Sequence, residues 1–125
     1  MSVTASALTK QDEEQRGALV ERVFHGGIAV LEMLSIYVGD RLGLYRALAQ
    51  SGPATSTQLA QSAGIDERYA REWLEQQAVS GVLEVDDPST PPEERLYSMP
   101  AGHREVLTAS DSPMSLVSLA VLIGA

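Results

Sequence analysis

Residues 52–99 read GPATSTQLAQSAGIDERYAREWLEQQAVSGVLEVDDPSTPPEERLYSM, and this stretch decides the fold. Thr55 and Gln58 have the spacing of a capping box, which predicts a short helix that ends near Ala63. Gly64 suits the positive φ of a tight turn between two crossing helices. A longer helix and a two-stranded hairpin follow. This order of elements predicts a winged helix-turn-helix.

The longer helix has a start signal, a stop signal and an apolar stripe. Asp66 is placed as its N-cap, and Gly81 is placed to end it in a left-handed conformation. Its large apolar residues recur at four-residue spacing, which predicts one buried face. Across the winged unit we expect a core of Leu59, Ile65, Tyr69, Trp73, Leu74 and Leu83.

The hairpin is expected to begin directly after the helix. Val82, Leu83 and Val85 predict the first strand, the run DDPSTPP predicts the turn, and residues 95–99 predict the return strand. A lone hairpin is marginally stable in water, so it must pack against the helices.

The charge of this unit argues against nucleic acid. Residues 52–99 carry nine acidic residues and three arginines, a net charge of −6. A helix that reads DNA approaches phosphates and needs a basic footprint, which is missing here. We therefore favour a winged helix that serves packing and dimerisation. The alternative functions are a winged-helix DNA-binding transcriptional regulator and a stand-alone scaffold.

The bulk composition agrees with a globular domain. The chain has 125 residues, 44% hydrophobic residues, a formal charge of −8 and no cysteine, which excludes disulfides and thiolate metal sites. We expect a cytoplasmic protein without a targeting segment. The apolar stretches 26–39 and 114–125 are shorter than the roughly 20 residues of a membrane span, so no membrane partner is expected.

The region before the winged unit is predicted to dimerise. Residues 1–8 form a mobile tail, and residues 9–51 form helices that begin with Thr9 as a cap. Gly26 and Gly27 are possible points of kinking or breaking. Residues 28–38 are apolar on nearly every face, so we expect burial on two sides, one of them by a second subunit. A central helix of a monomeric core is the alternative. The predicted dimer contacts are Val23, Ile28, Leu31 and Leu34.

Two further helical stretches flank the winged unit. Residues 39–50 predict a short helix in which Leu42, Tyr45 and Leu48 pack on that unit. Residues 100–125 begin with helix-start chemistry at Pro100 and end in an apolar run, and we expect a helical connector toward a further domain.

Candidates for catalytic or metal chemistry are weak. His25 and His103 lack the spacing of a zinc site, and we expect both at partly exposed polar positions. The acidic pairs Asp86–Asp87 and Glu93–Glu94 flank the proline-rich turn, where a solvated wing tip is expected rather than a buried acid and base. No P-loop, nucleophile elbow or glycine-rich dinucleotide loop is present.

The runs GDRLGLYRAL (39–48) and ERYAREWLEQQAVSG (67–81), with the strand that follows, carry a family resemblance. Residues 21–107 resemble the N-terminal winged-helix domain of bacterial class I S-adenosylmethionine-dependent methyltransferases. The resemblance implies an interlocked homodimer, a lid over a small-molecule acceptor and a separate C-terminal Rossmann-like domain that binds the methyl donor. That donor-binding domain is missing from this chain, because no strand is followed by its glycine-rich loop.

The predicted fold is therefore mainly α with a small antiparallel β-hairpin. The predicted function is dimerisation and substrate capping in a small-molecule methyltransferase, with no catalytic, cofactor-binding or metal-binding residue in this chain. S-adenosylmethionine is implied only for the full-length enzyme. Phe24, Met33 and Tyr37 are the candidate walls of the substrate pocket.

Overall fold

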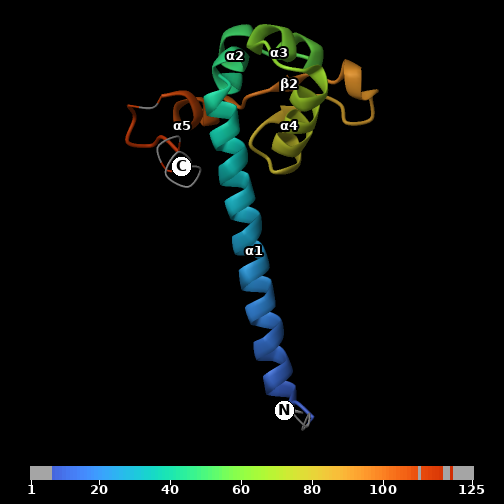
Figure 1. Ribbon diagram of the computed structural model, residues 1–125, viewed down its shortest axis with the longest axis vertical. Helices are drawn as coiled ribbons and strands as arrows, with labels where there is room; N and C mark the ends of the chain where they lie inside the picture. The colour runs from blue at the N-terminus through green and yellow to red at the C-terminus, as the bar shows by residue number, and fades with distance from the viewer. Residues whose placement is uncertain (1–6, 110, 117–118, 120–125) are drawn as a thin grey trace. The chain divides into compact units, whose positions relative to one another are not determined.

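The computed structural model describes residues 7–109, 111–116 and 119, which form two compact units, Met1–Leu31 and Glu32–Ala125. Most of the predicted tail 1–8, and most of the predicted connector helix after 114, lie outside the described residues. The elements in chain order (Figure 1) are α1 Lys10–Arg41, α2 Leu44–Ser51, α3 Ser56–Ala63, α4 Glu67–Val79, β1 Glu84–Val85, the 3-10 helix η1 Pro92–Glu94, β2 Tyr97–Ser98, the 3-10 helix η2 Ala101–His103 and α5 Arg104–Thr108.

Helix α1 begins where the sequence predicted. The hydroxyl of Thr9 accepts a hydrogen bond from the backbone of Asp12 at 3.1 Å, and the Asp12 carboxylate accepts one from the Thr9 backbone at 3.0 Å. Hydrogen bonding with the side chain and backbone of Thr9 lowers the pKa of Asp12. The helix continues through Gly26 and Gly27, so these glycines do not break it.

The junction between α1 and α2 differs from the prediction of one helix over residues 39–50. Helix α1 continues to Arg41, and Gly43 then turns the chain with a φ of 71°. Leu42 falls in the turn and is exposed, whereas Leu44 takes the expected place in the core beside Tyr45 and Leu48. The three-residue spacing identified the buried face but missed the start of the helix.

The helix-turn-helix is capped as predicted. Thr55 and Gln58 form the reciprocal capping box at the start of α3, and Gly64 ends that helix with a φ of 69°. Asp66 accepts a hydrogen bond from the backbone of Arg68 at 2.8 Å and so caps α4. Figure 1 shows α2, α3 and α4 next to one another in the second unit.

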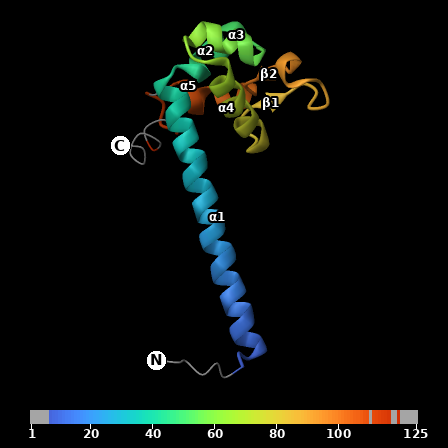
Figure 2. The same cartoon turned by 45° about the vertical axis from the view of Figure 1, so that its right-hand side comes forward.

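The hairpin is shorter than predicted. Strands β1 and β2 are antiparallel, with Val85 opposite Tyr97, and each has two residues (Figure 2). Val82 and Leu83 do not extend β1, because their N–H groups donate to the Gln77 carbonyl at the end of α4. Ala54 pairs with Tyr97 as an isolated bridge, which joins the hairpin to the start of the helix-turn-helix.

The core of the second unit lies between its helices and the hairpin. Leu59, Trp73, Leu74 and Leu83 are buried in it, and Ile65 packs partly buried against it. The prediction for Tyr69 is wrong, because its side chain is 70% exposed. The remaining buried members of this core are Ile36, Leu44, Tyr45, Leu48, Ala54, Tyr97 and Leu107.

The exposure of Tyr69 follows from helix geometry. The buried residues of α4 are Ala70, Trp73, Leu74 and Gln77, which have the three-and-four spacing of one face. Each step of four residues turns about 40° on a helix of 3.6 residues per turn, so Tyr69 lies at the edge of that face. The fully buried Gln77 lies near its centre.

A polar pair is enclosed in this core. The hydroxyl of Tyr45 donates a hydrogen bond to Oε1 of Gln77, and Nε2 of Gln77 donates to Oε1 of Gln76 at 2.8 Å. Burial, with the charge of Asp40, raises the pKa of Tyr45 well above its usual range, so the phenol stays protonated and remains a donor. The pair fixes α2 against α4.

Removing this hydroxyl should destabilise the fold. In the Tyr45→Phe variant the buried Gln77 oxygen loses its donor, and we expect the free energy of unfolding to fall by about 1–3 kcal/mol. Urea denaturation followed by far-ultraviolet circular dichroism measures this change. The matched control is Tyr69→Phe on exposed surface, for which a change within about 0.5 kcal/mol is expected. Equal effects of the two variants would contradict the role of the Tyr45–Gln77 pair.

Candidate functional site: the apolar surface of α1

The first unit presents a row of exposed apolar side chains on α1. Every described residue of this unit, from 7 to 31, is exposed. Val20, Val23, Phe24 and Leu31 are at least 62% exposed and recur at intervals of three, four and seven residues. This spacing places them on one side of the helix. We call Val20, Val23, Phe24, Ile28, Val30 and Leu31 the α1 stripe.

The last part of α1 belongs to the second unit and has two different faces. Ile36 is buried, and Met33 and Tyr37 pack partly buried against the core. Leu34 and Val38 are 37% and 42% exposed. Residues 28–38 were expected to be buried on two sides. In the part of this segment that belongs to the second unit, one face packs against the core and the other is exposed. Exposed apolar side chains grouped on one face of a helix are candidates for an interaction surface.

The four residues predicted to contact a second subunit are accessible for that role. Val23 and Leu31 are each 63% exposed, and Ile28 and Leu34 are 39% and 37% exposed. None of them is needed to fill the core of the protomer. The dimer contact remains a prediction.

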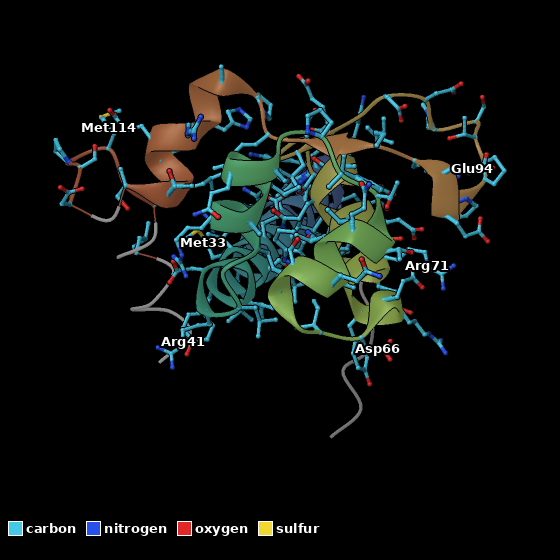
Figure 3. The ribbon with its side chains drawn as sticks, turned by 90° about the horizontal axis from the view of Figure 1, so that it is seen from above. Met33, Arg41, Asp66, Arg71, Glu94 and Met114 are labelled. Carbon is cyan, nitrogen blue, oxygen red and sulfur yellow. The ribbon has the colours of Figure 1, made fainter. Side chains whose placement is uncertain are left out.

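The three residues predicted to line a substrate pocket differ in their surroundings. Phe24 belongs to the first unit and is 65% exposed, with its ring edge-to-face against His25 at a centroid distance of 6.1 Å. Met33 and Tyr37 belong to the second unit and pack against its core. Met33 is labelled in Figure 3. Their role in binding an acceptor remains a prediction.

A small open cavity in the second unit has none of these residues in its walls. Its volume is about 220 Å³. The guanidinium of Arg104 at its rim donates to the backbone carbonyl of Ala49 at 3.2 Å. Sequence reasoning missed this cavity, because its walls come from two stretches of the chain, 48–53 and 98–104, that are far apart in the sequence. The wall residues are Leu48, Ala49, Gly52, Pro53, Ser98, Met99, Ala101 and Arg104.

The arginines of the winged unit are paired with glutamates. Within 52–99, Arg68 lies 3.2 Å from Glu72, Arg71 lies 3.6 Å from Glu67, and Arg95 lies 3.9 Å from Glu75. Figure 3 shows Asp66, Arg71 and Glu94 at the periphery of the second unit. The positive charges that a phosphate backbone would need are thus compensated within the unit.

Asp86 and Asp87 stabilise the turn of the wing by accepting hydrogen bonds. Asp87 accepts hydrogen bonds from the backbone and hydroxyl of Ser89, and the side-chain bond is the main cause of its lowered pKa. Asp86 accepts from the backbone of Leu96 at 2.9 Å. Glu93 and Glu94 are exposed in η1, as expected for a solvated wing tip.

The histidines also have ordinary surroundings. His25 is exposed, and Nδ1 of the half-buried His103 lies 2.8 Å from the carbonyl of Val82. Among the described residues, no group of three histidine, cysteine, aspartate or glutamate side chains is arranged to hold a metal ion.

No helix in the described part of the chain is long and apolar enough to cross a membrane.

These features define the class of protein, a winged helix-turn-helix domain with a long, partly apolar helix before it. The model of the family described as the Rv2258c-like winged HTH domain matches residues 29–109. The chain belongs to this family. No curated protein matches the sequence.

Several solved structures of methyltransferases have the same fold over this chain. The mitomycin 7-O-methyltransferase MmcR is 28% identical, with a TM-score of 0.65 over 90% of this chain and 31% of its own. The human N-acetylserotonin methyltransferase in complex with SAM is 18% identical, with a TM-score of 0.66 over 99% of this chain and 32% of its own. The N,N-8-amino-8-demethyl-D-riboflavin dimethyltransferase RosA from Streptomyces davawensis is 21% identical, with a TM-score of 0.61 over 81% of this chain and 28% of its own.

The similarities to the human N-acetylserotonin methyltransferase and to RosA show a shared fold alone. The chain spans between 28% and 32% of the length of these three proteins. The resemblance to the winged-helix domain of methyltransferases, predicted from the sequence, is confirmed. The mainly α fold with a small antiparallel hairpin is confirmed as well.

Proposed function

We propose that this chain is the dimerisation and substrate-capping domain of a small-molecule S-adenosylmethionine-dependent methyltransferase. The observation that carries the proposal is the exposed α1 stripe. The chain that bears it is 28% identical to the methyltransferase MmcR. The donor-binding Rossmann-like domain lies outside these 125 residues in this proposal, so the cofactor has no site on them. The proposed location is the cytoplasm.

The dimer contact is proposed to use Val23, Ile28, Leu31 and Leu34. These side chains are exposed in the protomer and carry no charge, so a second copy would remove their apolar surface from water. Burial of such surface contributes roughly 25 cal/mol per Å² before the cost of association is subtracted.

The capping role is proposed for Phe24, Met33 and Tyr37. Aromatic and thioether side chains are suited to the wall of an apolar acceptor site. Acting as a lid, the domain would exclude water from the acceptor and hold it near the methyl donor. Both effects lower the barrier of a bimolecular transfer through proximity and desolvation.

A charge placed in the α1 stripe should dissociate the dimer. In Leu31→Asp a carboxylate would have to be buried in the contact, and we expect sedimentation velocity to show monomer or aggregate where the parent chain is dimeric. Ala29→Asp is the matched control, because it adds the same charge to the same helix about half a turn from the stripe centre. An intact Leu31→Asp dimer would move the interface elsewhere.

Ligand binding separates the proposal from its alternatives. Calorimetry of this chain with S-adenosylmethionine should show no tight binding, and tight binding would overturn the assignment of the donor site to another domain. A transcriptional regulator would instead shift duplex DNA at moderate salt, and the Arg68→Ala, Arg71→Ala double variant would abolish that shift. We expect no shift even at low salt, because both arginines are paired with glutamates.

A further inference from the structure

The small cavity of the second unit lies where the chain before α3 stops pairing with β2. Ala54 and Tyr97 exchange two backbone hydrogen bonds, of 3.0 and 2.9 Å. In an antiparallel ladder the next pair of this kind would join Gly52 and Met99, two residues further along each segment. That pair does not form, because Gly52 has a φ of 74° and its N–H donates to a carbonyl of α2 at 3.0 Å. Both residues line the cavity instead.

The missing pair leaves a backbone donor at the cavity. Tyr97 directs its N–H toward Ala54, and peptide groups alternate in direction along a strand, so the N–H of Met99 is directed to the same side. Met99 precedes Pro100, which favours the extended conformation that this alternation requires. Among the described residues, no acceptor meets this N–H. It is therefore available to an acceptor in the cavity.

A positive charge stands at the same cavity. Among the described residues that form its walls, Arg104 alone is charged. The bond from its guanidinium to the Ala49 carbonyl holds the group in place, and its other N–H groups have no partner in the described part of the chain. Arg68, Arg71 and Arg95 are each paired with a glutamate, so they differ from Arg104 in this respect.

The remaining walls decide what kind of anion fits. Leu48, Pro53 and the side chain of Met99 are apolar, which disfavours a strongly hydrated ion such as phosphate. A guanidinium matches the planar fork of a carboxylate and can bind it through two parallel hydrogen bonds. The volume of about 220 Å³ is below the ~300–1,000 Å³ of pockets for drug-sized ligands, so the ligand must be small.

We propose that this cavity binds a small carboxylic acid in its ionised form. The carboxylate accepts hydrogen bonds from Arg104 and from the N–H of Met99, and its apolar body contacts Leu48 and Pro53. This site uses neither the α1 stripe nor a methyl donor, so it goes beyond the proposed function.

Titration of this chain with benzoate tests the site. Amide proton–nitrogen correlation NMR spectra at pH 7 should show saturable shifts for the Met99 amide and for other residues that line the cavity. Benzamide has the same shape without the charge, and we expect it to bind at least about tenfold more weakly, because hydrogen bonds to charged groups are the stronger ones. Inorganic phosphate, an anion without an apolar body, should also bind more weakly than benzoate.

Arg104→Gln removes the charge and keeps a polar side chain. We expect it to weaken benzoate binding by about tenfold or more and to leave benzamide binding unchanged. Arg41→Gln is the matched control, because Arg41 is also exposed in the second unit but does not line the cavity. It should bind benzoate as the parent chain does. The spectra of both variants also report whether the fold is intact, and Arg104→Lys, which keeps the charge, replaces Arg104→Gln if that variant unfolds.

The other outcomes would overturn the proposal. Equal binding of benzoate and benzamide would mean an apolar cavity without a carboxylate site. Phosphate binding as tight as that of benzoate would mean a general anion site. The absence of saturable shifts at millimolar benzoate, or shifts confined to residues outside the cavity walls, would mean that no small acid binds there. None of these results depends on dimerisation, so the proposed function stands or falls separately.

Discussion

Replacing Trp73 with alanine should lower the free energy of unfolding by about 3–5 kcal/mol, which is a large part of the stability of a small domain. Trp73 is 8% exposed, and its ring lies edge-to-face with that of Tyr45 at a centroid distance of 5.1 Å. Its Nε1 donates a hydrogen bond to the carbonyl of Ser35 on α1 at 3.0 Å. Truncation would lose the ring burial, the aromatic contact and the bond that attaches α1 to α4.

The experiment needs a control on the same helix. Urea denaturation of Trp73→Ala and Tyr69→Ala, at one protomer concentration and followed by circular dichroism, compares a buried with an exposed aromatic side chain. The Tyr69→Ala change is expected within about 0.5 kcal/mol. An unchanged denaturation midpoint for Trp73→Ala would show that this residue does not hold the core together.

The second large effect is expected from Gly39→Val. A Cβ at this position would lie 2.5 Å from Cζ2 of Trp73 and 2.6 Å from Cε2 of Tyr45, so two buried rings and the α1 backbone would have to move. Overpacking of this kind costs typically 1–3 kcal/mol, and we expect about 3 kcal/mol or more because valine adds two methyl groups to the clash.

Gly17→Val is the matched control for Gly39→Val. It makes the same substitution in α1, where an added Cβ meets nothing within 4 Å. We expect its denaturation midpoint to stay the same or rise slightly, since valine disfavours a helix less than glycine does. A Gly39→Val variant as stable as Gly17→Val would mean that the close packing of α1 on Trp73 does not exist in solution.

Local signals in the sequence predicted much of the winged unit. The capping box at Thr55, the left-handed Gly64 and the cap at Asp66 depend on residues within four positions of one another, so the sequence alone reveals them. The burial of Trp73 followed from its place in an apolar stripe. These features need no knowledge of distant contacts.

Features that depend on a distant partner were not predicted from the sequence. Gln77 is polar in sequence, yet the hydroxyl of Tyr45, thirty-two residues away, makes its burial favourable. Val82 and Leu83 have strand composition, but the end of α4 takes their N–H groups. The close packing at Gly39 depends on two rings that only the tertiary structure brings together.

The candidate site was predictable only in part. Periodicity placed Val23, Ile28, Leu31 and Leu34 on one side of a helix, and the structure shows that all four are exposed in the protomer. The cavity beside Arg104 was not predictable, because it is formed by two distant stretches of the chain, 48–53 and 98–104, that share no motif.

The exposure of every described α1 residue before position 32 has a consequence for the protein in the cell. In the proposed dimer these apolar side chains become buried only when a second copy binds, so a newly synthesised chain first presents them to chaperones and proteases. Its lifetime should therefore depend on its own expression level, with unpaired molecules cleared faster than paired ones.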